Sequence, residues 1–74
     1  MSMKFYIVTG FTEPGLFNDR DAAMADLKTR RLDHEEAGYG VFKGRIFERD
    51  IDLSDLEMRM EGDKGFYVAS LRKV

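Results

Sequence analysis

The sequence predicts an α+β fold in which one helix packs on one face of a three- to four-stranded, mainly antiparallel sheet. A single stretch, from Asn18 to Ala37, has a helical pattern. Short runs of aromatic and β-branched residues lie on both sides of it, as is typical of strands. A chain of 74 residues forms one small domain. The expected order of elements is β-α-β-β-β.

The predicted helix has recognisable signals at both ends. Asn18 is expected to cap a free amide of the first turn, and Asp21 occupies the position of its capping-box partner. The apolar stripe fades after Leu27, so the pattern supports a helix to about Leu32. Gly38 is expected to end it.

Two strands are predicted around this helix, from Met3 to Thr9 and from Tyr39 to Phe47. The loop from Gly10 to Gly15 contains Pro14-Gly15, a turn in which glycine supplies a positive φ. Within the second strand, the small size of Gly40 and Gly44 leaves room for an aromatic ring or the helix to lie over the backbone.

The C-terminal half allows more than one interpretation. Apolar and acidic residues alternate from Phe47 to Leu53, which fits a strand that continues after a kink or an extended acidic connection. Ser54-x-x-Glu57 fits a capping box and a second helix. We prefer a β-hairpin from Leu56 to Leu71, because the residues from Leu56 to Met60 alternate with a period of two. The edge strand of such a hairpin could pair with another chain.

The predicted core draws on both the helix and the strands. Its expected members are Ile7, Phe17, Met24, Leu27, Phe42, Ile46, Met58 and Val68. We leave Met1 and Ser2 out of the fold argument.

Composition narrows the classes of function. Cysteine is absent, so disulfides and thiolate metal sites are excluded. No apolar run approaches the roughly 20 residues of a membrane span, and no signal-peptide pattern opens the chain. We therefore expect a cytoplasmic protein. A net charge of −2 argues against general affinity for nucleic acid.

No motif predicts catalysis. His34 stands among acidic residues and could serve as a general base, but we interpret it as part of a solvated helix end. Asp50, Asp52 and Asp55 lack the central glycine and terminal glutamate of a calcium loop. We expect no catalytic residues, no cofactor and no metal.

The distinctive electrostatic feature is acidic. From Glu48 to Asp63 there are seven acids and two arginines, a local charge of −5. Such a surface attracts a protein partner with basic residues. The candidate protein-binding residues are Glu48, Asp50, Asp52 and Asp55, together with Arg30 and Arg31 of the helix.

A nucleic-acid-binding surface is the alternative. Tyr39, Lys43 and Arg45 are expected on one face of the second strand, beside Phe47. Cations and stacking rings on a sheet are suited to binding nucleic acid.

Two short segments resemble a known binding module. Lys4-Phe5-Tyr6-Ile7-Val8 and Pro14-Gly15-Leu16-Phe17, followed by a helix near Asp21, resemble the N-terminal hybrid-binding domain of eukaryotic ribonuclease H and viroplasmin proteins. Gly40-Val41-Phe42-Lys43 is similar to a later strand of that family. The resemblance implies a non-catalytic module that binds an RNA–DNA duplex, although the tryptophan of the family falls at Arg20 here.

A second resemblance concerns the whole chain. Its length, acidic balance, lack of cysteine and single α+β unit resemble small phage-encoded regulators of host transcription, of the type found in lytic Xanthomonas phages. That resemblance implies a protein that binds RNA polymerase subunits and displaces the initiation factor. We therefore expect a protein-binding regulator, with RNA polymerase as the first partner to consider. If the protein is phage-encoded, the resemblance implies that it acts in the host cytoplasm.

Overall fold

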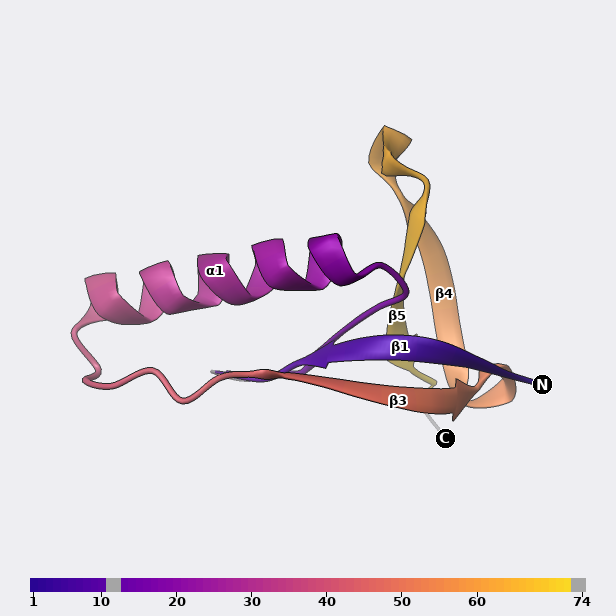
Figure 1. Ribbon diagram of the computed structural model, residues 1–74, viewed down its shortest axis with the longest axis horizontal. Helices are drawn as coiled ribbons and strands as arrows, with labels where there is room; N and C mark the ends of the chain where they lie inside the picture. Colours follow the sequence, from indigo (N-terminus) through magenta and orange to yellow (C-terminus); the bar gives the residue numbers. More distant parts are fainter. Residues whose placement is uncertain (11–12, 73–74) are drawn as a thin grey trace.

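The computed structural model describes residues 1–10 and 13–72 as one helix and a five-stranded antiparallel sheet, which confirms the predicted α+β class. Figure 1 shows these elements along the chain. Their bounds are β1 (Ser2–Val8), β2 (Gly15–Phe17), α1 (Arg20–Ala37), β3 (Ile46–Asp52), β4 (Leu56–Glu61) and β5 (Phe66–Leu71). Two short 3-10 helices, Leu53–Asp55 and Gly62–Lys64, precede and follow β4.

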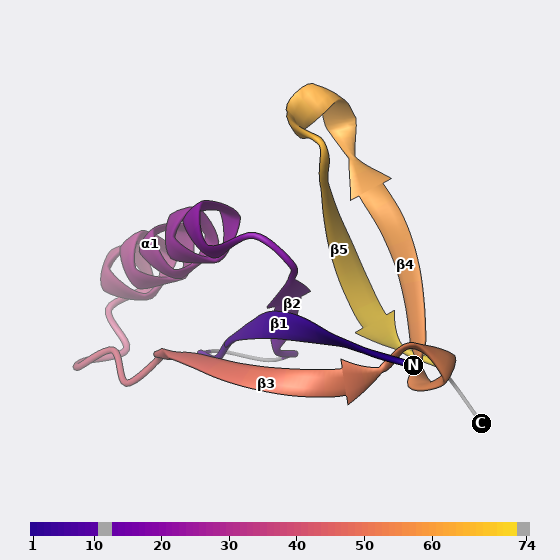
Figure 2. The same cartoon turned by 45° about the vertical axis from the view of Figure 1, so that its right-hand side comes forward.

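The strand order is β3-β1-β2-β5-β4, and each neighbouring pair is antiparallel. The β4–β5 hairpin rises steeply from the plane of β1 and β3 (Figures 1 and 2). The sheet is therefore strongly bent at β2, which joins the two halves. One strand more is present than predicted, because Gly15–Phe17 pairs with β1 and β5 instead of forming only a turn.

The core lies on the face of the sheet that points away from α1. Phe5, Leu16 and Leu56 are buried and form one cluster, although they come from three different strands. The registers place their side chains on one face of the sheet. The partly buried residues packed against the cluster are Met3, Ile7, Ile51, Leu53, Met58 and Ala69.

The helix covers the opposite face of β1 and β2, where Val8 and Ala23 are fully buried. Only part of the predicted core is correct. Met24, expected to face the sheet, is 51% exposed. Leu27 is only partly buried, because the tightest helix–sheet contact is made by the small side chain of Ala23.

The helix begins one residue later than predicted. Asp19, not Asn18, is the N-cap, and its carboxylate accepts a hydrogen bond from the Ala22 amide at 2.9 Å. The Asn18 side chain instead accepts a hydrogen bond from the Tyr67 amide of β5 at 2.7 Å. It therefore makes a tertiary contact and does not cap the helix. The helix continues beyond Leu32 to Ala37. Gly38 ends it in the left-handed conformation, as predicted.

The predicted strand from Tyr39 to Phe47 is wrong in position. Residues 38–45 form an irregular connection, and β3 starts at Ile46 and includes the acidic residues to Asp52. Of the two interpretations of that segment, the strand is therefore correct. Gly44 explains part of the shift: a Cβ there would collide with the Phe42 ring and the Thr9 carbonyl, so an aromatic ring does lie over this glycine. Gly40 has no such neighbour.

The predicted hairpin is confirmed, and no second α-helix forms within the described residues, since Leu53–Asp55 is a single 3-10 turn. Two smaller expectations are wrong. Ser2 belongs to β1 and pairs with Asp52, so the first residues are part of the sheet. Gly15 does not adopt a positive φ and begins β2. Phe11 and Thr12 of the predicted loop lie outside the described residues.

Replacing Leu56 with alanine is expected to lower the free energy of unfolding by roughly 2–5 kcal/mol, because Leu56 is 2% exposed within the core cluster. Met24→Ala is the matched control. Its side chain is half exposed, and surface substitutions usually change stability by less than about 0.5 kcal/mol. Urea unfolding followed by circular dichroism measures both. Equal losses for the two variants would contradict this description of the core.

Candidate protein-binding surfaces

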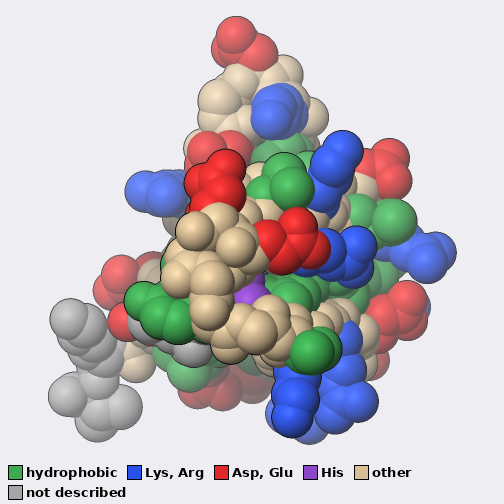
Figure 3. Space-filling model, turned by 90° about the vertical axis from the view of Figure 1, so that its left-hand side faces the viewer, with side chains coloured by type: hydrophobic (Ala, Val, Ile, Leu, Met, Phe, Trp, Pro, Cys, Tyr) green, Lys and Arg blue, Asp and Glu red, His purple; other side chains and the backbone are tan. Residues whose placement is uncertain are grey.

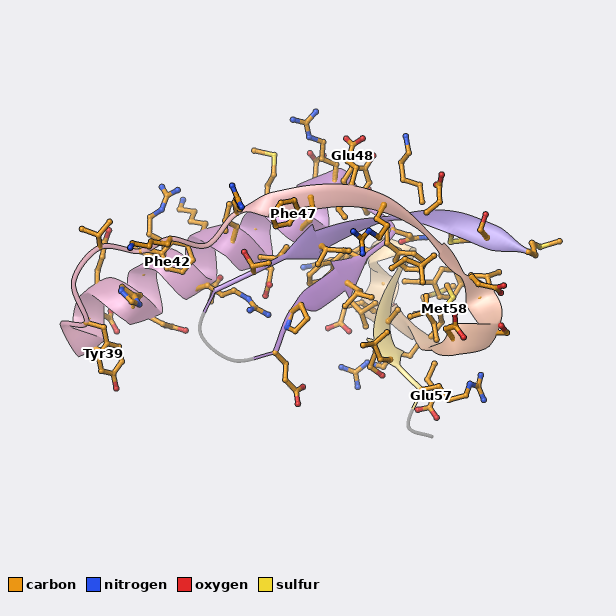
Figure 4. The ribbon with its side chains drawn as sticks, turned by 90° about the horizontal axis from the view of Figure 1, so that it is seen from below. Tyr39, Phe42, Phe47, Glu48, Glu57 and Met58 are labelled. Carbon is orange, nitrogen blue, oxygen red and sulfur yellow. The ribbon has the colours of Figure 1, made fainter. Side chains whose placement is uncertain are left out.

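Strand β3 brings three of the predicted acidic residues together at an edge of the sheet. It pairs with β1 on one side, and no described strand pairs with it on the other. Glu48, Asp50 and Asp52 alternate along it and therefore share one face. Phe47 and Glu48 leave the strand in different directions (Figure 4). The carboxylates are exposed, so this edge is an accessible row of negative charge.

Asp52 has a second role at the end of β3. Its Oδ1 atom accepts hydrogen bonds from the Ser54 amide and the Ser54 hydroxyl, both at 3.0 Å. The amide bond first, and then the hydroxyl bond, lower the pKa of the Asp52 carboxyl below its ordinary value. Asp52 is therefore ionised at neutral pH. Asp55, the remaining predicted acid, follows in the 3-10 turn, where its carbonyl accepts the Arg72 amide at 2.9 Å.

The two predicted arginines of the helix differ in environment. Arg30 donates through Nε to Asp26 at 2.8 Å and through Nη1 to the carbonyls of Gly10 and Glu13 at 2.7 and 2.8 Å. Its side chain is 18% exposed, so its charge is occupied within the fold. A Cβ on Gly15 would lie 3.0 Å from the Asp26 carboxylate, which explains glycine at that position. Arg31 is exposed on α1.

The alternative nucleic-acid-binding residues do not lie on a strand face. Tyr39, Lys43 and Arg45 are exposed in the connection between α1 and β3. The Arg45 guanidinium lies 4.7 Å from the centre of the Phe47 ring, a cation–π contact. Figure 3 views the end of the molecule where α1 finishes, and Lys and Arg side chains gather at its lower edge.

His34 is not part of a solvated helix end. It is partly buried, and its ring centre lies 5.7 Å from that of Tyr39 and 5.5 Å from that of Phe42. The single histidine therefore helps to pack the connection after α1 against the helix. The same aromatic cluster places Phe42 over Gly44.

An edge strand in the hairpin was expected from the sequence, but which strand it is and the groove beside it were not predicted. Strand β4 is the second edge of the sheet, and Glu57 and Arg59 alternate on its exposed face. An open groove of about 730 Å³ also lies between this hairpin and α1. Its walls include Ala25 and Thr29 of the helix and Val68 of β5. The signal for the edge was present in the strict alternation of β4, but the strand order was needed to show which side is unpaired.

Within residues 1–10 and 13–72, no group of three or more acidic or histidine side chains is arranged to hold a metal ion. In the same part of the chain, no helix is long and apolar enough to cross a membrane. Comparisons with protein-family models, curated proteins and solved structures found no match.

Ser54→Ala is expected to raise the pKa of the Asp52 carboxyl but to leave it below its ordinary value. The variant removes the hydroxyl bond and keeps the stronger amide bond. Because the lowered pKa stabilises the folded state above the unfolded pKa, this contribution disappears as pH falls through the folded pKa. Carboxyl chemical shifts followed by NMR between acidic and neutral pH measure it. An unchanged Asp52 pKa would show that the hydroxyl bond contributes nothing.

Arg30→Met is expected to lower the free energy of unfolding by about 1–3 kcal/mol, because it leaves Asp26 and two carbonyls without their charged donor. Arg31→Met removes the same charge from an exposed site on the same helix and serves as the control. Urea unfolding measures the free energy of unfolding of both variants. A similar small effect in both variants would argue against a structural role for Arg30.

Proposed function

We propose that this protein is a non-catalytic regulator that binds another protein through the outer edge of β3. The observation that supports this function is an unpaired strand edge, among the described residues, that carries Glu48, Asp50 and Asp52 on one face. An open edge binds an extended segment by adding it as a further strand. The acidic row favours a segment with lysine or arginine at alternate positions.

The backbone of β3 is oriented for this role. Arg45 and Leu53 direct their backbone groups toward β1, since the Thr9 amide donates to the Arg45 carbonyl and the Leu53 amide to the Met1 carbonyl, both at 2.9 Å. Backbone direction alternates along an antiparallel strand. The even-numbered residues between them therefore point their amides and carbonyls outward, so the three acidic residues offer both hydrogen bonds and charge to a partner.

The pairing of β3 with β1 shows which kind of side chain already lies beside these carboxylates. Lys4 of β1 lies opposite Asp50, and its Nζ atom is 3.9 Å from the Glu48 carboxylate. A basic side chain on an adjacent strand thus already meets the acidic face. Opposite charges on neighbouring strands stabilise pairing modestly, while like charges oppose it. A basic strand on the outer side would repeat this contact.

Bacterial RNA polymerase is the first partner to test, because the chain resembles small phage-encoded regulators that bind its subunits. In that proposal, the protein occupies a basic extended segment of a polymerase subunit and interferes with the initiation factor. Asp55 and Arg31 stay within the proposed surface as exposed charges, whereas Arg30 is left out because the fold occupies its guanidinium.

Asp50→Lys is expected to weaken binding to the partner roughly 10-fold or more, because it replaces the central carboxylate of the row with a like charge for a basic strand. The control is Glu36→Lys, which makes the same change of net charge at an exposed position of α1. Tagged protein is used to capture RNA polymerase from a bacterial lysate, and affinity is then measured with the purified enzyme.

The outcomes separate the parts of this proposal. Failure to recover any polymerase subunit would exclude the named partner. Equal weakening by both variants would exclude the β3 edge as the binding site. Retention of an RNA–DNA hybrid in a gel shift, weakened by salt and lost when Lys43 and Arg45 become alanine, would replace the proposal with the nucleic-acid alternative.

A further inference from the structure

The second open edge of the sheet has a different charge pattern from the first. Strand β4 pairs with β5 on one side, and within the described residues no strand pairs with its other side. Its sequence is nearly symmetric about Met58, with Glu57 and Arg59 next to it and Leu56 and Met60 beyond them. We propose that β4 pairs antiparallel with β4 of a second copy of this chain, about a twofold axis at Met58.

The centre of the charged face of β4 is complementary to itself in this register, while Glu61 at the end of the strand falls opposite Asp55 in the 3-10 turn of the second copy. When Met58 lies opposite its own copy, Glu57 lies opposite Arg59 of the second chain, and Arg59 lies opposite Glu57. Two ion pairs form by symmetry. Within one chain, Arg59 is 80% exposed and only approaches Glu61, at 4.0 Å. Its charge is therefore available to a partner strand.

The apolar face matches in the same register. Leu56 is opposite Met60 of the second copy, and the two Met58 side chains meet at the axis. Met58 packs against the core cluster that contains Leu56, whereas Met60 is 54% exposed. Glu57 and Met58 point in different directions from the strand (Figure 4). Pairing would cover Met60 and extend the core of each copy across the axis.

Backbone amides and carbonyls of alternate residues in β4 point outward, as pairing with a second β4 strand requires. The Arg72 amide donates to the Asp55 carbonyl at 2.9 Å, which directs the backbone of Asp55 toward β5. By alternation, Met58 and Met60 direct their amides and carbonyls outward. Leu56 is already engaged, because its amide donates to the Leu53 carbonyl and its carbonyl accepts the Arg72 guanidinium at 3.0 Å. A symmetric pair at Met58 can then exchange two hydrogen bonds.

The same pairing is unfavourable at β3. An axis at Arg49 would place Glu48 opposite Asp50 of the second copy, and an axis at Glu48 or Asp50 would place an acid opposite itself. Like charges directly opposite destabilise a sheet. The two edges therefore select different partners: β4 fits a second copy of the chain, and β3 does not. The inference does not depend on the proposed function.

A charge exchange tests the register. Glu57→Arg and Arg59→Glu each place two like-charged pairs across the axis, so each is expected to raise the dissociation constant of the dimer roughly 10- to 100-fold. The double variant Glu57→Arg/Arg59→Glu restores opposite charges and is expected to recover the dimer. Sedimentation equilibrium over a range of protein concentrations measures all four proteins, and circular dichroism verifies that each is folded.

Glu36→Lys is the matched control, because it reverses one exposed charge on α1, outside both open strands, and is expected to leave dimerisation unchanged. A wild-type protein that is monomeric at every concentration would overturn the inference. So would single variants that dimerise as the wild type does, or a folded double variant that stays monomeric. None of these results bears on binding to a basic partner at β3.

Discussion

The pairing of β2 with β5 is the contact on which the rest of the structure depends. Only Leu16 and Phe17 take part in the ladder, opposite Ala69 and Val68. Asn18 extends it, because its amide donates to the Tyr67 carbonyl at 3.1 Å and its side chain accepts the Tyr67 amide. A two-stranded hairpin is marginally stable alone. This short joint therefore holds β4–β5 on the sheet, and through it Leu56 of β4 joins the core cluster with Phe5 and Leu16.

Alternation along each strand explains why the two open edges differ in character. The apolar face contributes to the core, so Glu48, Asp50 and Asp52 of β3 and Glu57 and Arg59 of β4 lie on the other face, where they are exposed. On β3 these residues are all acidic, which suits a basic partner and opposes self-association. On β4 they alternate in sign about Met58, which suits a second copy. Binding to a partner and dimerisation would therefore use separate strands and need not compete.

Some positions were predictable because local chemistry decided them. Gly38 ends the helix since few other residues adopt its left-handed conformation, and the alternation in β4 was sufficient to predict the hairpin. Other predictions were wrong because a distant contact prevailed. The Asn18 side chain accepts a hydrogen bond from an amide of β5 instead of capping the helix. Arg30 has the sequence context of a surface cation, but its guanidinium donates to two loop carbonyls. No spacing in the sequence indicates these hydrogen bonds.

The sequence by itself determined the α+β class, the single helix, the hairpin and the excess of acidic residues from Glu48 to Asp63, because these follow from periodicity and composition. Only the tertiary structure decided that β3 and β4 are edges, and that three of these acids, Glu48, Asp50 and Asp52, form one row along an open edge. Strand order arises from long-range pairing through β2. Since an edge is defined by the neighbour it lacks, no pattern within one strand could have identified it.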